Sequence, residues 1–108
     1  MRRAIAVAGC IWIATVNMAL AQNEGDVRRG QAFAQQICAK CHALQRGQAD
    51  SPHPQAPTFP VIAQVPGLTA LALTVSLQSA HNAMPDLVLE TQERHDVIAF
   101  ILSLRRAN

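Results

Sequence analysis

The longest apolar stretch of the chain lies at its N-terminus, directly after two arginines. It runs from Ala4 to Val16 and is followed by an A-x-A sequence at residues 19–21. A basic start, a short apolar centre and an A-x-A end are typical of a secretory signal peptide. The stretch is also shorter than the roughly 20 residues that a membrane-spanning helix needs. We therefore expect residues 1–21 to be a cleaved signal peptide and residues 22–108 to form one mature domain in the periplasm, with no membrane insertion after cleavage.

The first helix of the mature chain is predicted directly before its cysteines. It begins at Asp26, whose carboxylate suits an N-cap, and runs to about Ala39. Apolar or small residues recur there every three or four positions, at Val27, Gly30, Ala34, Ile37 and Cys41. This spacing is typical of one buried face of a helix.

A proline-rich loop is expected to follow. Residues 45–60 contain four prolines, which remove backbone donors and resist helix formation. We expect residues 61–65 to form one short turn, and residues 81–89 to be a connector interrupted by Pro85. A loop of this length in a small domain is usually functional.

Two further helices are predicted in the second half of the chain. One covers residues 69–80, with an apolar side formed by Leu68, Leu71, Ala72 and Val75. The other runs from Thr91 to about Arg105, acidic at its start and basic at its end, as the helix macrodipole favours. No segment shows the alternation of a strand, so the sequence predicts an all-α fold.

Charge and composition change once the leader is removed. The 108 residues include nine basic and seven acidic ones, and two of the basic ones are Arg2 and Arg3. Removing 21 residues therefore leaves a mature chain of 87 residues with seven of each sign and no formal net charge. Such a chain has no polybasic surface, which argues against nucleic acid or an anionic membrane as a partner.

The two cysteines of the mature chain belong to one motif. Residues 38–42 read Cys-Ala-Lys-Cys-His, which is the C-x-x-C-H signal for attachment of a c-type haem. Thiols at this spacing can reach the two vinyl groups of one haem, and the adjacent histidine can then bind the iron. Cys38 and Cys41 are therefore the candidate attachment points, and His42 is the candidate proximal ligand.

A Cys-x-x-Cys pair has two other common uses. A thioredoxin-like disulfide requires a surrounding βαβ unit, which the pattern does not predict. A zinc site requires four ligands, and the mature chain has no second cysteine pair, only His53, His81 and His95 besides the motif. Together with the export signal, the motif favours haem.

Around this motif the chain resembles the class I c-type cytochromes, in particular the small monohaem members of the bacterial periplasm. The resemblance rests on Gly25 to Val27 and Gly30 before the motif. Weaker matches follow in the same order at residues 51–54, 56–59, 81–85 and 97–101. It implies a cytochrome c fold in which three to four helices wrap around one covalently attached haem c.

The same resemblance implies roles for individual residues. Met84, the only methionine after the leader, lies where the family places its second axial ligand. His53 and His81 are rival ligands, each expected instead to be a solvated loop histidine, and whether either contacts the haem stays open. His95 is expected to face solvent.

Two contacts within the protein are also implied. The carbonyl of Pro57 is expected to accept a hydrogen bond from the proximal imidazole, which would strengthen His42 as a ligand. Gly30 and Phe100 match the glycine and the aromatic residue at which the first and last helices of the family cross.

These features lead to the hypothesis of a periplasmic electron carrier that is not an enzyme. It would cycle between Fe(III) and Fe(II), taking an electron from a dehydrogenase or another donor and passing it to a downstream redox protein. Two alternatives remain: a haem subunit of a periplasmic oxidoreductase, and a haem sensor or weak peroxidase with a labile Met84. Because Lys40 is the only lysine, we expect docking to be largely apolar and weakly dependent on salt.

Overall fold

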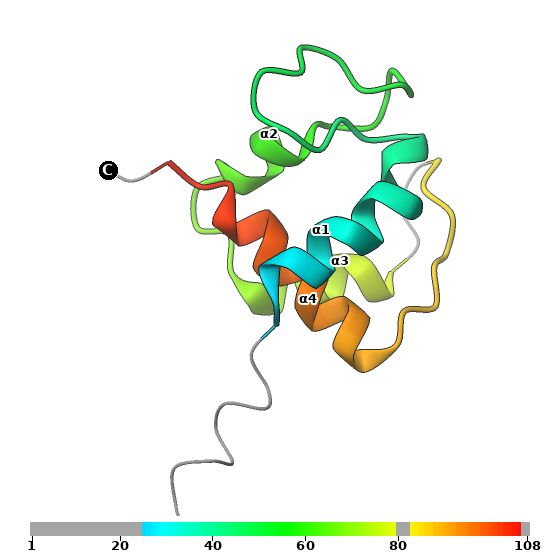
Figure 1. The fold of residues 1–108 in the computed structure, drawn as a ribbon, viewed down its shortest axis with the longest axis vertical. Coiled ribbons are helices and arrows are strands. Elements are labelled where there is room, and N and C mark those ends of the chain that lie inside the picture. The colour runs from blue at the N-terminus through cyan, green and yellow to red at the C-terminus, as the bar shows by residue number, and fades with distance from the viewer. Residues whose placement is uncertain (1–24, 80–82, 107–108) are drawn as a thin grey trace, which may run out of the picture.

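The computed structural model describes residues 25–79 and 83–106, which contain four α-helices, one short 3-10 helix and no β-strand (Figure 1). The helices are α1 (Val27–Gln36), η2 (Cys38–Lys40), α2 (Phe59–Ala63), α3 (Ala70–Gln78) and α4 (Thr91–Ser103). The predicted all-α class is confirmed for these residues. Within the same ranges, no helix is both long and apolar enough to cross a membrane. The predicted signal peptide lies outside the described residues.

Helix α1 begins where the sequence predicts but ends earlier. The Asp26 carboxylate accepts a hydrogen bond from the backbone N–H of Arg29 at 2.8 Å, as expected of an N-cap. The α-helix ends at Gln36, and the chain tightens into η2 instead of continuing to Ala39. The apolar face predicted for this helix is only partly buried. Gly30 and Ala34 at its centre are buried, whereas Val27 and Ile37 are 41% and 36% exposed.

The proline-rich loop ends at Thr58, two residues before Pro60, because α2 begins at Phe59. This corrects the prediction that the loop extends to Pro60 and that residues 61–65 form a turn. The Thr58 hydroxyl accepts a hydrogen bond from the N–H of Val61 at 3.3 Å and so caps α2. Pro60 occupies the first turn of α2, where a backbone N–H has no helical partner in any case. A proline at that position is therefore compatible with the helix.

Helix α3 buries a different side from the one predicted. Leu73 is buried, whereas Leu71 and Val75 of the predicted apolar side are 73% and 55% exposed. The helix is apolar on almost every side, so its sequence pattern does not indicate which side packs. The contact with α4 decides this instead. The predicted start is confirmed, with Thr69 as the N-cap.

Helices α1 and α4 cross at glycines, and theirs is the most extensive contact between helices. A Cβ atom on Gly30 would lie 1.9 Å from the carbonyl oxygen of Asp96 and 3.0 Å from Cβ of Phe100. A Cβ atom on Gly25 would lie 1.9 Å from the carbonyl oxygen of His95. No side chain fits at either position, so the expected close approach of Gly30 and Phe100 is confirmed.

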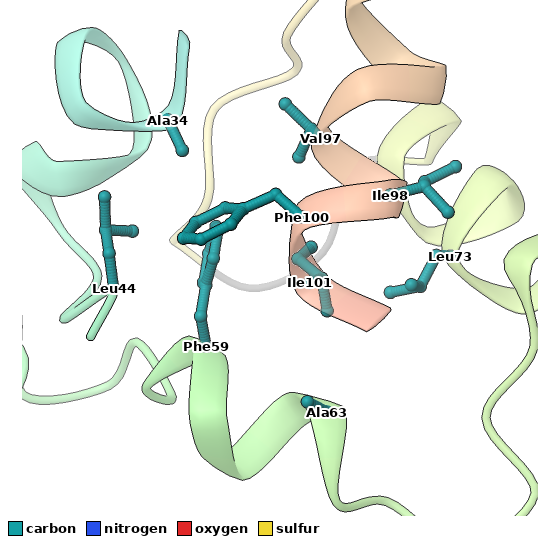
Figure 2. Close-up of a cluster of buried hydrophobic side chains, with 9 residues drawn as sticks. All are labelled: Ala34, Leu44, Phe59, Ala63, Leu73, Val97, Ile98, Phe100 and Ile101. Carbon is teal, nitrogen blue, oxygen red and sulfur yellow. The ribbon is translucent and has the colours of Figure 1, made fainter. Parts of the chain in front are cut away.

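The core lies between these crossing helices, α2 and α3 (Figure 2). Its two phenylalanine rings, Phe59 and Phe100, have centroids 6.0 Å apart and tilted planes, an arrangement that aromatic pairs prefer. The nine buried members of this cluster are Ala34, Leu44, Phe59, Ala63, Leu73, Val97, Ile98, Phe100 and Ile101. Phe59 places α2 beside the turn that carries the cysteine motif.

Candidate functional site

The C-x-x-C-H motif forms one tight turn at the end of α1. The backbone N–H groups of Cys41 and His42 both donate to the carbonyl of Cys38, at 3.1 and 2.9 Å. The two cysteines are free thiols, and all three side chains are partly buried. The structure thus brings both predicted attachment points and the predicted proximal ligand together in a single turn.

The orientation of His42 is fixed by Pro57. Nδ1 of the imidazole lies 2.6 Å from the Pro57 carbonyl oxygen. A carbonyl can only accept a hydrogen bond, so Nδ1 must carry the proton in this contact, and Nε2 of the neutral ring keeps its lone pair. The Phe59 ring packs beside the imidazole with a centroid distance of 5.3 Å. The contact expected from the resemblance is confirmed, and it leaves His42 with a nitrogen able to bind a metal.

Backbone hydrogen bonds hold the proline-rich loop close to the motif. The N–H of His53 donates to the carbonyl of Cys41 at 3.1 Å. Ala43 donates to the Ser51 hydroxyl at 3.0 Å, and its carbonyl accepts from the N–H of Phe59 at 2.8 Å. These bonds secure the loop at its middle and at its end. They explain how a segment poor in backbone donors keeps Pro57 against the imidazole.

The Cys38 thiol differs from the reactive thiol of a redox-active pair. Burial raises the pKa of Cys38 to about 11. Catalytic cysteines of Cys-x-x-Cys oxidoreductases have the opposite property, a lowered pKa that favours the thiolate. Cys38 would therefore be a poor nucleophile towards disulfides at neutral pH. In the part of the chain that the structure describes, no three His, Cys, Asp or Glu side chains form a group able to hold a metal ion.

The other predicted ligand is separate from the turn in sequence. Met84 is partly buried in the extended segment between α3 and α4, which runs along the same side of the molecule as η2 in Figure 1. No hydrogen bond or ring contact in the described residues joins it to His42. The assignment of Met84 to the candidate site therefore rests on its position in the sequence.

The remaining histidines have different surroundings. His53 is partly buried and accepts a hydrogen bond at Nδ1 from the N–H of Gln55 at 3.2 Å, so that nitrogen is already used. His95 is partly buried and lines an open groove between α3 and α4, so the expectation that it faces solvent is confirmed only in part. His81 lies outside the described residues.

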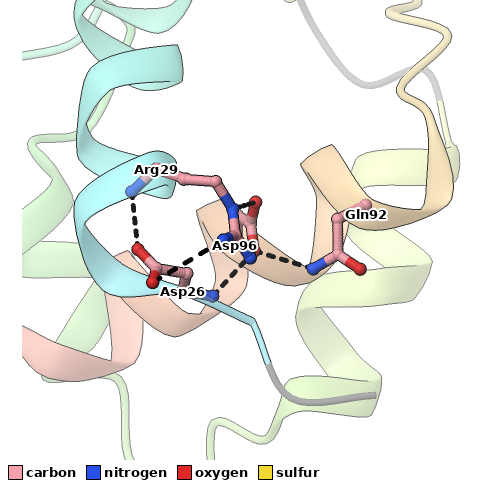
Figure 3. Close-up of polar contacts among 4 residues, drawn as sticks. All are labelled: Asp26, Arg29, Gln92 and Asp96. Atoms are coloured by element: carbon pink, nitrogen blue, oxygen red, sulfur yellow. Dashed lines mark hydrogen bonds and ion pairs between the residues drawn. The ribbon is translucent and has the colours of Figure 1, made fainter. Parts of the chain in front are cut away.

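A charged cluster that the sequence pattern does not predict lies at the α1–α4 crossing (Figure 3). The buried carboxylate of Asp96 accepts from the N–H of Asp26 at 2.7 Å, from Nε of Arg29 at 2.9 Å and from Nε2 of Gln92 at 2.9 Å. The hydrogen bond from Arg29 is the main cause that lowers the pKa of Asp96 to about 2. Its spacing from Phe100 is the signal that could have indicated Asp96. The two residues lie one helical turn apart, so both are on the face of α4 that packs against α1.

Compared with known proteins, the chain matches no family model, no curated protein and no solved structure. What the site does therefore has to be inferred from its own residues.

Proposed function

We propose that the mature chain is a periplasmic one-electron carrier with a cytochrome c fold built around one covalently attached haem c. The observation that carries the proposal is the contact of 2.6 Å between Nδ1 of His42 and the Pro57 carbonyl. This contact sets the tautomer and direction that an iron ligand needs. It occurs in the same turn as two thiols at the haem-attachment spacing.

Four residues would hold the group. Cys38 and Cys41 would bind it through thioethers, and Nε2 of His42 and the thioether sulfur of Met84 would be the axial ligands. When bound, the haem supplies reversible one-electron chemistry at its iron. The Pro57 carbonyl fixes the tautomer of the His42 imidazole and keeps the ring from rotating.

The ligand set favours electron transfer over catalysis. With His42 and Met84 on the two axial positions, no position would remain for oxygen, peroxide or another substrate. The chain would then exchange single electrons with a donor, such as a periplasmic dehydrogenase, and with a second redox protein as acceptor. The raised pKa of the partly buried Cys38 thiol supports a structural role for this cysteine, since a dithiol catalyst would need a reactive thiol.

The first test is the mass and absorption spectrum of the protein secreted by a host that attaches c-type haem. We expect a mature chain beginning at Gln22 and carrying one haem, with a weak far-red band in the ferric state from sulfur ligation and low-spin bands in the reduced state. A mature chain without bound haem would overturn the proposal.

Variants assign the ligands. Met84→Ala should remove the far-red band and let the reduced protein bind carbon monoxide, whereas Met84→His should remove the band and stay low-spin. His53→Ala is the matched control and should change neither property. A wild-type protein that already binds carbon monoxide at neutral pH would favour a sensor or weak peroxidase. Constant co-purification with a larger oxidoreductase would favour a haem subunit.

A further inference from the structure

A surface groove of about 300 Å³ lies between α2 and the C-terminal end of α4, closed on one side by the turn at residues 46–47. The residues that line it include Arg46, Pro60, Val61, Val65, Leu104 and Arg106. In Figure 1 these segments lie on the side of the molecule opposite the extended segment that carries Met84. The groove is therefore separate from the candidate haem site.

The floor of the groove is apolar and open to solvent. Val61 lies in α2 and Val65 lies two residues after its end, and they are 60% and 49% exposed. Neither side chain joins the core described above. Exposed apolar side chains gathered in a concave surface are typical of a binding site for an apolar group.

The rims of the groove carry positive charge with no ionic partner. Within the described residues, the only ion pairs join Arg29 to Asp26 and Asp96, so neither Arg46 nor Arg106 is paired. The exposed Asp50, four residues after Arg46, forms no ion pair with it. Arg105 adds a third positive charge next to Arg106.

The acidic residues at the start of α4 are too distant to neutralise the charge on these arginines. Glu90 and Glu93 lie at the other end of this helix. At 1.5 Å per residue, about 20 Å of helix separates that end from Arg105, well beyond the Debye length of roughly 8 Å at physiological salt. The partial negative charge of the helix C-terminus offsets only part of the charge on the arginines.

Hydrogen bonds across the groove fix its walls. Arg46 donates from Nη2 to the carbonyl of Arg105 at 3.0 Å, which ties the turn to the end of α4. Gln64 donates to the carbonyl of Leu104 at 3.1 Å, and Arg105 donates to the carbonyls of Ala63 and Leu68. The groove is therefore a built feature of the fold, shaped before any partner arrives.

We propose that this groove binds an acidic segment of a partner protein, with an apolar side chain over Val61 and Val65 and flanking carboxylates on Arg46 and Arg106. A narrow groove with two charged rims fits a peptide chain better than a bilayer, which would require a broad basic surface. Docking here would hold the partner while leaving the opposite side of the molecule free for electron exchange. The inference does not depend on the haem.

The test is a titration of the secreted, reduced, ¹⁵N-labelled protein with an acetylated pentapeptide that has one leucine between two pairs of glutamates. We expect amide shifts confined to residues 46–47, 60–65 and 104–106. We also expect affinity that falls as salt is added, in contrast to the weakly salt-dependent docking expected from the single lysine. The same peptide with glutamines in place of the glutamates should bind at least ten-fold more weakly.

Variants separate the charged and apolar contributions. Arg46→Gln with Arg106→Gln should weaken binding at least ten-fold, and Val61→Thr should weaken it several-fold while preserving side-chain size. Arg28→Gln, an exposed arginine of α1, is the matched control and should leave the affinity unchanged. Shifts outside the groove, equal affinity in all variants, or binding to anionic phospholipid vesicles that needs the same two arginines would overturn the proposal.

Discussion

The buried carboxylate of Asp96 makes folding stability depend on pH in a way that can be calculated. Its pKa is lowered from 3.8 to about 2 in the folded chain, first by the hydrogen bond from Arg29. One pKa unit corresponds to about 1.36 kcal/mol, so ionised Asp96 contributes about 2 kcal/mol relative to its protonated form. Asp96 is only 4% exposed, but the side chain of its main partner Arg29 is 61% exposed, so solvent screening reduces this figure. We therefore expect Asp96→Asn to lose about 1–2 kcal/mol at neutral pH.

The direction of the pH effect follows from the lowered pKa. A carboxylate whose pKa is lower in the folded than in the unfolded chain stabilises the protein fully above the unfolded value. Its contribution is then lost as the pH falls from about 4 through about 2. The difference between wild type and Asp96→Asn should therefore be constant from pH 7 down to about pH 5 and should shrink steadily below that.

Urea unfolding of the secreted protein, followed by far-UV circular dichroism at several pH values, measures this difference. Asp50→Asn is the matched control, because Asp50 is exposed and lies outside the α1–α4 contact. Combining Asp96→Asn with Arg29→Gln should cost less than the sum of the two single changes, since the two side chains share a hydrogen bond of 2.9 Å. An unchanged free energy of unfolding for Asp96→Asn at pH 7, or a difference that persists at pH 2, would refute the reasoning.

Substitutions at Gly30, Phe59 and Thr69, with Gly67 as a comparison, test packing and helix capping by the same urea assay. Gly30→Ala should destabilise by about 3 kcal/mol, because its Cβ would meet the backbone of α4 at 1.9 Å. A Cβ atom on Gly67 would have no neighbour within 4 Å, so Gly67→Ala should cost only about 1 kcal/mol, from the positive φ of 73°. Equal losses for Gly30→Ala and Gly67→Ala would contradict this account. Phe59→Ala should cost about 3–5 kcal/mol by leaving a cavity, whereas Phe59→Leu should cost clearly less. Thr69→Ala should cost about 1 kcal/mol by removing the cap of α3, and Thr69→Ser should restore most of it.

Local features of this chain could be predicted from its sequence because they depend on neighbouring residues. Asp26 and Thr69 cap their helices through side chains that bond to N–H groups three residues ahead, at 2.8 and 3.0 Å. The start of α4 was predicted from its acidic residues, and Glu90 with Glu93 forms a reciprocal capping box there. The cysteine motif was likewise visible because its residues adjoin in the chain.

Features that depend on packing could not be predicted from periodicity. Helix α3 offers apolar side chains on opposite sides, and only the contact with α4 determines that Leu73 is buried while Leu71 is 73% exposed. Pro60 counted as a helix breaker, although the first turn of α2 tolerates it once Thr58 supplies a cap. The arginine-rimmed groove arises from residues that lie far apart in the sequence, so no local pattern marks it.

A chain of contacts connects the proposed ligand to the crossing of α1 and α4. The Pro57 carbonyl holds His42 through a hydrogen bond to Nδ1, and the Phe59 ring packs beside the imidazole. Phe59 in turn packs on Phe100, which lies against Gly30 at the crossing. An imidazole held both at its nitrogen and beside its ring has little freedom to turn. The close approach that only glycine permits between the helices therefore also determines where the free nitrogen of His42 is presented.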